Sequence, residues 1–124
     1  MRVFKTKSFG RFAGREGIEN PMLCTAIGHV RAGRIDADLG GGVIKQRIAR
    51  PGEGKSGGFR SIILYRKGSN AFFVYGFAKN DRGNIRPDEL KAFRKLASEL
   101  LGLGEAALAA TIRNGTIMEI RCNG

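Results

Sequence analysis

The sequence has few of the residues on which most active sites depend. It contains 1 histidine, His29, with 2 cysteines and no tryptophan among its 124 residues. A single histidine cannot build a His-rich metal site, and Cys24 and Cys122 lie far apart without CxxC spacing. The sequence also offers no Ser/His/Asp grouping that can be placed together. We therefore expect no metal, no other cofactor and no conventional hydrolase site, and we expect His29 to be structural or at the surface.

Long apolar segments are absent as well. No apolar run approaches the roughly 20 residues that cross a bilayer. Residues 1–17 are basic, are interrupted by glycines and lack the apolar centre of a signal peptide. We therefore predict a cytoplasmic protein with no membrane partner, whose two cysteines stay reduced as thiols.

Acidic residues are also few, and the balance of charge is the main compositional signal. There are 11 Asp and Glu against 22 Lys and Arg, for a formal charge of +11. Most of the excess of positive charge falls between Val43 and Arg86, a segment with ten basic and two acidic residues. Such an excess favours polyanionic partners, nucleic acid above all. The bland alternative is a positively charged surface with no specific partner.

The length and the 42% apolar content fit one domain, spanning 1–124. Alternation and helical spacing of apolar residues predict a mixed order of elements. The expected strands are Arg2–Thr6, Ile35–Leu39, Val43–Ile48, Phe59–Arg66, Ala71–Ala78 and Thr116–Arg121, and the expected helices are Lys7–Glu16, Asn20 to Gly33 with Asn20 as its cap, Pro87–Leu101 and Glu105–Arg113. This order is typical of an α+β domain with meander-like central strands.

Strand parity places several of the basic residues together. Lys45 and Arg47 must point to one face of their strand, and Tyr75 and Lys79 share another such parity. Arg60 lies near the start of its own expected strand, so antiparallel pairing could gather these side chains in one shallow cleft. Tyr75 could stack on a base there. The alternatives stay open: Lys45 and Arg47 as the solvated side of an edge strand, and Tyr75 as part of the core.

Clustered cations suffice for one class of reaction. RNA carries its own nucleophile, the 2′-hydroxyl, so a metal-independent ribonuclease needs only to orient it, move its proton and stabilise charge on the phosphate. The glycine-rich stretch Gly52–Gly58 lacks the GxxxxGK[ST] spacing of a phosphate loop. We therefore reject nucleotide binding.

Three motifs in order, GGFR from Gly57, YGFAKN from Tyr75 and DELKAFRKLA from Asp88, resemble the RelE/HigB-like toxins of type II toxin–antitoxin pairs. The likeness also includes Asp38–Arg50 and covers most of the chain from about residue 36. It implies a small α+β domain whose twisted, mostly antiparallel sheet has its helices packed on one side and a concave basic face on the other. It also implies a metal-independent, ribosome-dependent mRNA endoribonuclease that inhibits translation. The partners it implies are mRNA on the ribosome and a cognate antitoxin encoded by a neighbouring gene, with a helix-turn-helix protein as one option for that antitoxin.

The resemblance also assigns residues. By resemblance the catalytic group is expected to be Lys45, Arg47, Arg60 and Lys79, with Lys55 and Arg82 as further RNA-binding residues. The run of basic residues adds Arg50 to the expected RNA-binding residues, and the possibility of base stacking adds Tyr75. The loop Ala49–Gly57 is longer than in the shortest relatives, and the late catalytic tyrosine of some members has no clear equivalent. Two other functions remain open: a ParE-like toxin that acts on a protein such as gyrase, and a non-catalytic RNA- or ribosome-binding module.

Overall fold

The computed structural model describes residues 1–50, 52 and 57–122. Within these residues the elements in chain order are β1 (Val3–Thr6), α1 (Lys7–Glu16), α2 (Asn20–Arg31), β2 (Ala37–Gly40), β3 (Val43–Ile48), β4 (Phe59–Tyr65), β5 (Ala71–Ala78), α3 (Pro87–Leu101), α4 (Glu105–Arg113) and β6 (Ile117–Ile120). Every expected helix and strand is therefore present. The described helices include none that is both long enough and apolar enough to cross a membrane.

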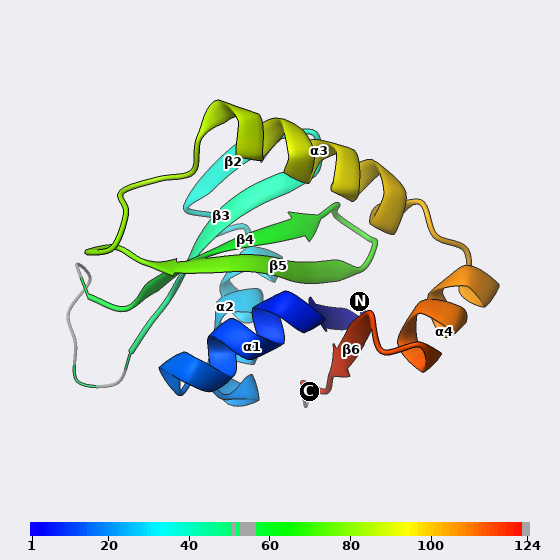
Figure 1. Ribbon diagram of the computed structural model, residues 1–124, viewed down its shortest axis with the longest axis horizontal. Coiled ribbons are helices and arrows are strands. Elements are labelled where there is room, and N and C mark those ends of the chain that lie inside the picture. Colours follow the sequence, from blue (N-terminus) through cyan, green and yellow to red (C-terminus); the bar gives the residue numbers. More distant parts are fainter. Residues whose placement is uncertain (51, 53–56, 123–124) are drawn as a thin grey trace.

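The strands form one sheet in the order β2-β3-β4-β5-β1-β6. All neighbouring pairs are antiparallel except β1 and β5, which run parallel. The α+β class and the mostly antiparallel sheet expected from the sequence are thus confirmed. The insertion of β1 between β5 and β6 joins the two ends of the chain in the sheet (Figure 1).

The helices lie on both faces of the sheet, so the expectation that they pack on one side was wrong (Figure 1). On one face, residues of α1 and α2 such as Phe9 and Leu23 belong to the core cluster that contains Ile63. On the other face, Ala97 of α3 and Leu108 of α4 belong to the cluster around Ile62. The reason is that the central strands are apolar in both directions, so each face needs its own cover.

Local signals set the ends of the helices. The Thr6 hydroxyl accepts a hydrogen bond from the backbone N–H of Phe9, so β1 passes directly into α1. α2 starts one residue earlier than expected, because Glu19 is its N-cap and Asn20 is its first residue. Pro87 opens α3, and the Glu89 carboxylate accepts from the Arg86 backbone N–H at 2.7 Å.

The turn between β2 and β3 fixes where α3 lies. Gly40, Gly41 and Gly42 all have positive φ, at 80°, 63° and 81°, a region that only glycine enters readily. A Cβ on Gly41 would lie 2.8 Å from the side chain of Arg94. α3 therefore rests on this end of the sheet, and the charged side chains at the other end of β3 and the start of β4 remain partly exposed.

The two cysteines form a disulfide, which contradicts the expectation of free thiols. Cys24 lies on α2 and Cys122 follows β6, and their Cα atoms are 5.5 Å apart despite a sequence separation of 98. Spacing along the chain gave no sign of this contact. It arises because β6 pairs with β1 at the edge of the sheet, which brings the end of the chain to α2.

Candidate nucleic-acid interface

Three cations share the sheet face on which α3 lies. Arg47 of β3 is directly opposite Arg60 of β4, and Lys45 is directly opposite Ile62. Since Ile62 belongs to the core cluster under α3, the residues of matching parity point to the same side. We call Lys45, Arg47 and Arg60 the basic face. The structure therefore brings together three of the four residues that the sequence named as catalytic.

The neighbouring strand completes this surface with aromatic residues. Phe77 of β5 is opposite Arg60, and Tyr75 is opposite Ile62. Two rows thus cross the three strands: Lys45–Ile62–Tyr75, and Arg47–Arg60–Phe77. Opposed residues on antiparallel strands lie about 5 Å apart and diagonal ones about 7–8 Å, so long side chains from both rows can reach one phosphodiester.

The electrostatics of the basic face favour an anion. Like charges directly opposite each other on a sheet are destabilising, and Arg47 and Arg60 occupy such opposed positions. The Arg47 Nε donates to the Gly57 carbonyl at 3.3 Å, whereas the Arg60 Nη1 is 3.5 Å from the Phe59 carbonyl, a long and weak contact. A phosphate between the two side chains would accept charge-assisted hydrogen bonds from both.

A buried side chain on the opposite side of β3 holds this strand in place. Gln46 is 2% exposed; its Nε2 donates to the Arg34 carbonyl at 3.0 Å and its Oε1 accepts from the Asp36 N–H at 3.0 Å. The Asp36 carboxylate in turn accepts from the backbone N–H of Arg47. These bonds tie the segment between α2 and β2 to the strand that carries the basic face.

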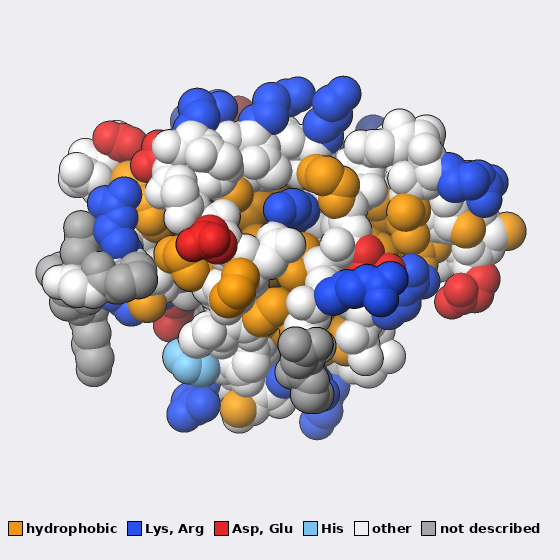
Figure 2. Space-filling model, turned by 90° about the horizontal axis from the view of Figure 1, so that it is seen from below, with side chains coloured by type: hydrophobic (Ala, Val, Ile, Leu, Met, Phe, Trp, Pro, Cys, Tyr) orange, Lys and Arg blue, Asp and Glu red, His pale blue; other side chains and the backbone are white. Residues whose placement is uncertain are grey.

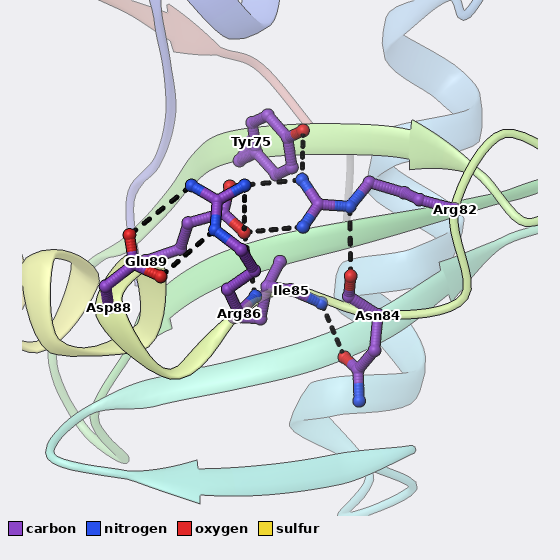
Figure 3. Close-up of polar contacts among 7 residues, drawn as sticks. All are labelled: Tyr75, Arg82, Asn84, Ile85, Arg86, Asp88 and Glu89. Atoms are coloured by element: carbon purple, nitrogen blue, oxygen red, sulfur yellow. Dashed lines mark hydrogen bonds and ion pairs between the residues drawn. The ribbon is translucent and has the colours of Figure 1, made fainter.

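Arg82, in the loop after β5, does not project freely as an RNA contact would. Its Nη1 donates to Tyr75 Oη at 2.9 Å and to Glu89 Oε2 at 3.0 Å, and its Nη2 donates to Glu89 Oε1 (Figure 3). Its Nε donates to the Asn84 carbonyl at 2.9 Å. The guanidinium also lies 5.7 Å from the ring centroid of Phe77. Arg82 is therefore a bridge from β5 to the first turn of α3.

The pKa values of the two partners follow from this contact. The hydrogen bonds from Arg82, together with that from the Arg86 backbone, lower the pKa of Glu89 to about 2. The same contact with Glu89 raises the pKa of Arg82 above its ordinary value. Both groups are thus charged throughout the physiological range, and the ion pair is permanent there.

The remaining expected residues lie elsewhere. Lys79 is in the turn after β5 and borders a pocket of about 680 Å³ together with Arg50, Phe59 and Glu16. The Arg50 guanidinium lies 4.7 Å from the ring centroid of Phe59, whose ring belongs to the core cluster on the α1 and α2 side. Arg50 is therefore not on the basic face. Lys55 lies outside the described residues.

His29 is exposed on α2 and borders a different pocket, on the side away from α3. Figure 2 shows that side of the molecule, with the histidine at the surface and Lys and Arg side chains around smaller apolar areas. The expectation that His29 is a structural or surface residue is therefore confirmed.

A family model for the RelE toxin of the RelE/RelB toxin–antitoxin system matches residues 1–120. The chain belongs to the RelE family. A search of curated proteins returned no match. The family match confirms the resemblance expected from the motifs, and it makes this RelE-family chain a toxin of toxin–antitoxin type, whose partner class is an antitoxin.

Sequence reasoning missed two residues that shape this RelE-family site. One is Glu89, because nothing in its spacing along the chain pointed to Arg82. Gln46 was passed over between two cations, although strand parity puts it on the inner side, where a polar residue needs partners. That parity was the available signal.

Proposed function

We propose that this chain is the toxin of a type II toxin–antitoxin pair and cleaves mRNA on the ribosome without a metal ion. The observation that carries the proposal is the cross-strand pair Arg47–Arg60, with Lys45 two residues away on the same face. Three cations on one sheet surface can grip a phosphodiester and stabilise charge on it during transfer. The membership of the RelE family supports the same reaction class.

The roles follow from the chemistry of each group. Arg60 would bind two phosphate oxygens, because a guanidinium presents donors in a fixed fork. Arg47 would orient the 2′-hydroxyl, because a guanidinium stays protonated, and Lys45 would orient that hydroxyl or receive its proton. Lys79, which the sequence suggested as a fourth catalytic group, borders the pocket of about 680 Å³ together with Arg50. In this proposal Lys79, Arg50 and Lys55 bind the RNA chain at nucleotides further from the cleaved bond.

The partner proposed for this toxin is an antitoxin encoded by the neighbouring gene, with a helix-turn-helix protein as one candidate. The formal charge of +11 would speed its association with an acidic segment at low salt. Expression of the chain alone should stop growth, and co-expression of that neighbour should restore it. Normal growth of cells that contain abundant folded protein would contradict this.

The reaction is tested with ribosomes programmed with a defined mRNA, whose fragments are mapped and timed. Arg60→Ala should slow cleavage about a hundred- to a thousandfold, the loss expected for one charge-stabilising group. Arg66→Ala is the matched control, because Arg66 is an exposed arginine in the turn after β4, away from the basic face. Cleavage by Arg60→Ala at the parental rate would refute the assignment.

The same assay separates the alternatives. A non-catalytic module would bind ribosomes and leave the mRNA intact. A ParE-like toxin would leave both alone and would instead inhibit a protein such as gyrase in a supercoiling assay. Intact mRNA under conditions that saturate the ribosome with toxin would therefore overturn the nuclease proposal.

A further inference from the structure

Tyr75 occupies a defined position in the rows of the basic face. It stands on β5 opposite Ile62, which is itself opposite Lys45. Arg60 is opposite Phe77, two residues further along β5 on the same face. Tyr75 and Arg60 are thus diagonal neighbours, at a separation that their side chains can span.

The structure fixes the Tyr75 side chain more firmly than a residue that only contacts RNA requires. Its ring centroid is 5.9 Å from that of Phe77 and 5.8 Å from that of Phe93 on α3. Its Oη accepts a hydrogen bond from Arg82 at 2.9 Å (Figure 3). The ring therefore already has two aromatic neighbours within the protein, and base stacking by Tyr75 stays a prediction.

The Tyr75 hydroxyl can still donate one hydrogen bond. Arg82 can only donate, so Oη is the acceptor in that bond and its own hydrogen is still available. Among the residues that the structure describes, no protein group accepts that hydrogen. The Tyr75 side chain is half-buried beside the basic face. A fixed phenol with an available hydrogen, one diagonal step from a phosphate-gripping arginine, has the arrangement of a proton donor.

We infer that Tyr75 is the general acid that protonates the leaving 5′ oxygen in the proposed RNA cleavage, with Arg82 as the residue that positions it. This inference rests on the proposed function. Arg82 is held by Glu89, so the bidentate pair fixes both the place of the guanidinium and its charge. Its positive charge lies where negative charge develops on Oη, which stabilises the transition state.

The step balances in atoms and charge. The 2′ oxygen forms a bond to phosphorus and loses its proton to a base, while the bond between phosphorus and the 5′ oxygen breaks. The 5′ oxygen keeps that electron pair and takes the hydrogen from Tyr75. The products are a 2′,3′-cyclic phosphate and a 5′-hydroxyl, and the phenolate regains a proton from solvent.

The other role for this network is structural, because Arg82 joins β5 to the start of α3. Tyr75→Phe separates the two roles. It keeps the ring between Phe77 and Phe93, and Arg82 Nη1 keeps its second acceptor, Glu89 Oε2. The melting temperature should therefore fall by only a few degrees. Tyr65→Phe is the matched control, since Tyr65 packs against the core cluster on the opposite face.

The test uses single-turnover cleavage of ribosome-bound mRNA with either the natural linkage or a 5′-sulfur at the scissile position. A sulfur leaving group needs no proton. Tyr75→Phe should cut the natural linkage about a hundredfold more slowly or worse, yet cut the sulfur linkage at nearly the parental rate. Tyr65→Phe should match the parent on both substrates.

Two results would overturn the inference while leaving the proposed nuclease intact. One is cleavage of the natural linkage by Tyr75→Phe at the parental rate. The other is an equal loss on both linkages, which would make the hydroxyl a binding or packing group. A parent protein that cuts neither RNA would refute the proposed function, and this inference with it.

Discussion

The guanidinium of Arg82 meets the carboxylate of Glu89 at two points, with Nη1 3.0 Å from Oε2 and Nη2 against Oε1 (Figure 3). This pair joins the loop after β5 to the first turn of α3. It lies beside the basic face, so it links the stability of the α3 layer to the geometry of the site.

The first prediction concerns acid stability. The pKa of Glu89 is about 2 in the folded protein, below the value of about 4.3 for an unfolded glutamate. The unfolded chain therefore binds this proton first, and the contribution of Glu89 to stability is complete above about pH 5 and declines as pH falls towards 2. Glu89→Gln should weaken this dependence. Urea midpoints measured at neutral pH and near pH 3 should fall further for the parent than for the variant.

Glu99→Gln is the control for that experiment, because Glu99 is exposed on the same helix, away from Arg82. It should keep the parental acid dependence. If Glu89→Gln and the parent lose equal stability on acidification, the ion pair of Glu89 with Arg82 does not stabilise the folded protein in solution.

The second prediction concerns the buried amide on β3. Gln46→Ala removes the partners of the Arg34 carbonyl and the Asp36 N–H. Leaving such groups unsatisfied costs about 1–3 kcal/mol each when they are buried, and solvent reaches this segment in part, so we expect a loss of about 2 kcal/mol. Denaturant unfolding measures it. Lys45→Ala, one residue away on the other side of the strand, should change the unfolding free energy by less than about 0.5 kcal/mol. Equal stability of the two variants would show that the hydrogen bonds of Gln46 do not stabilise the fold.

The third prediction concerns the disulfide between Cys24 and Cys122. A bond that closes so long a segment of chain restricts the unfolded state, and its loss typically costs about 2–5 kcal/mol. A reducing agent should therefore lower the unfolding midpoint of the parent. Cys122→Ser should start at the lower midpoint and show no response to the reductant. Two titratable thiols in the protein folded under oxidising conditions would show that the bond does not form.

The fourth prediction concerns the contact of α1 with β5. A Cβ on Gly76 would lie 2.3 Å from the Phe12 ring, so Gly76→Ala must displace that ring from its contact with Phe59. Such overpacking costs about 1–3 kcal/mol. Gly14→Ala is the matched control, since a Cβ there meets nothing within 4 Å and alanine favours a helix by about 1 kcal/mol. Thermal unfolding should therefore shift in opposite directions for the two variants. A Gly76→Ala protein as stable as the parent would show that Phe12 moves without cost.

The sequence by itself determined the elements and part of the site. Period and capping signals are local properties of the chain, so α1, β3, β5, α3 and α4 have the bounds that those signals predicted. Strand parity is also local, and it placed Lys45 and Arg47 on one face before any pairing was known. The family followed from motifs in order, and its match to residues 1–120 confirms it.

Only the tertiary structure decided what depends on contacts between distant segments. The register of β3 with β4 put Arg47 opposite Arg60, and two apolar faces on the central strands drew helices to both sides of the sheet. The Arg82–Glu89 pair and the Cys24–Cys122 bond join residues whose separation in sequence carries no signal of their proximity. Such contacts are selected by packing of the whole domain, because a side chain finds its partner only once the strands and helices that carry both have assembled.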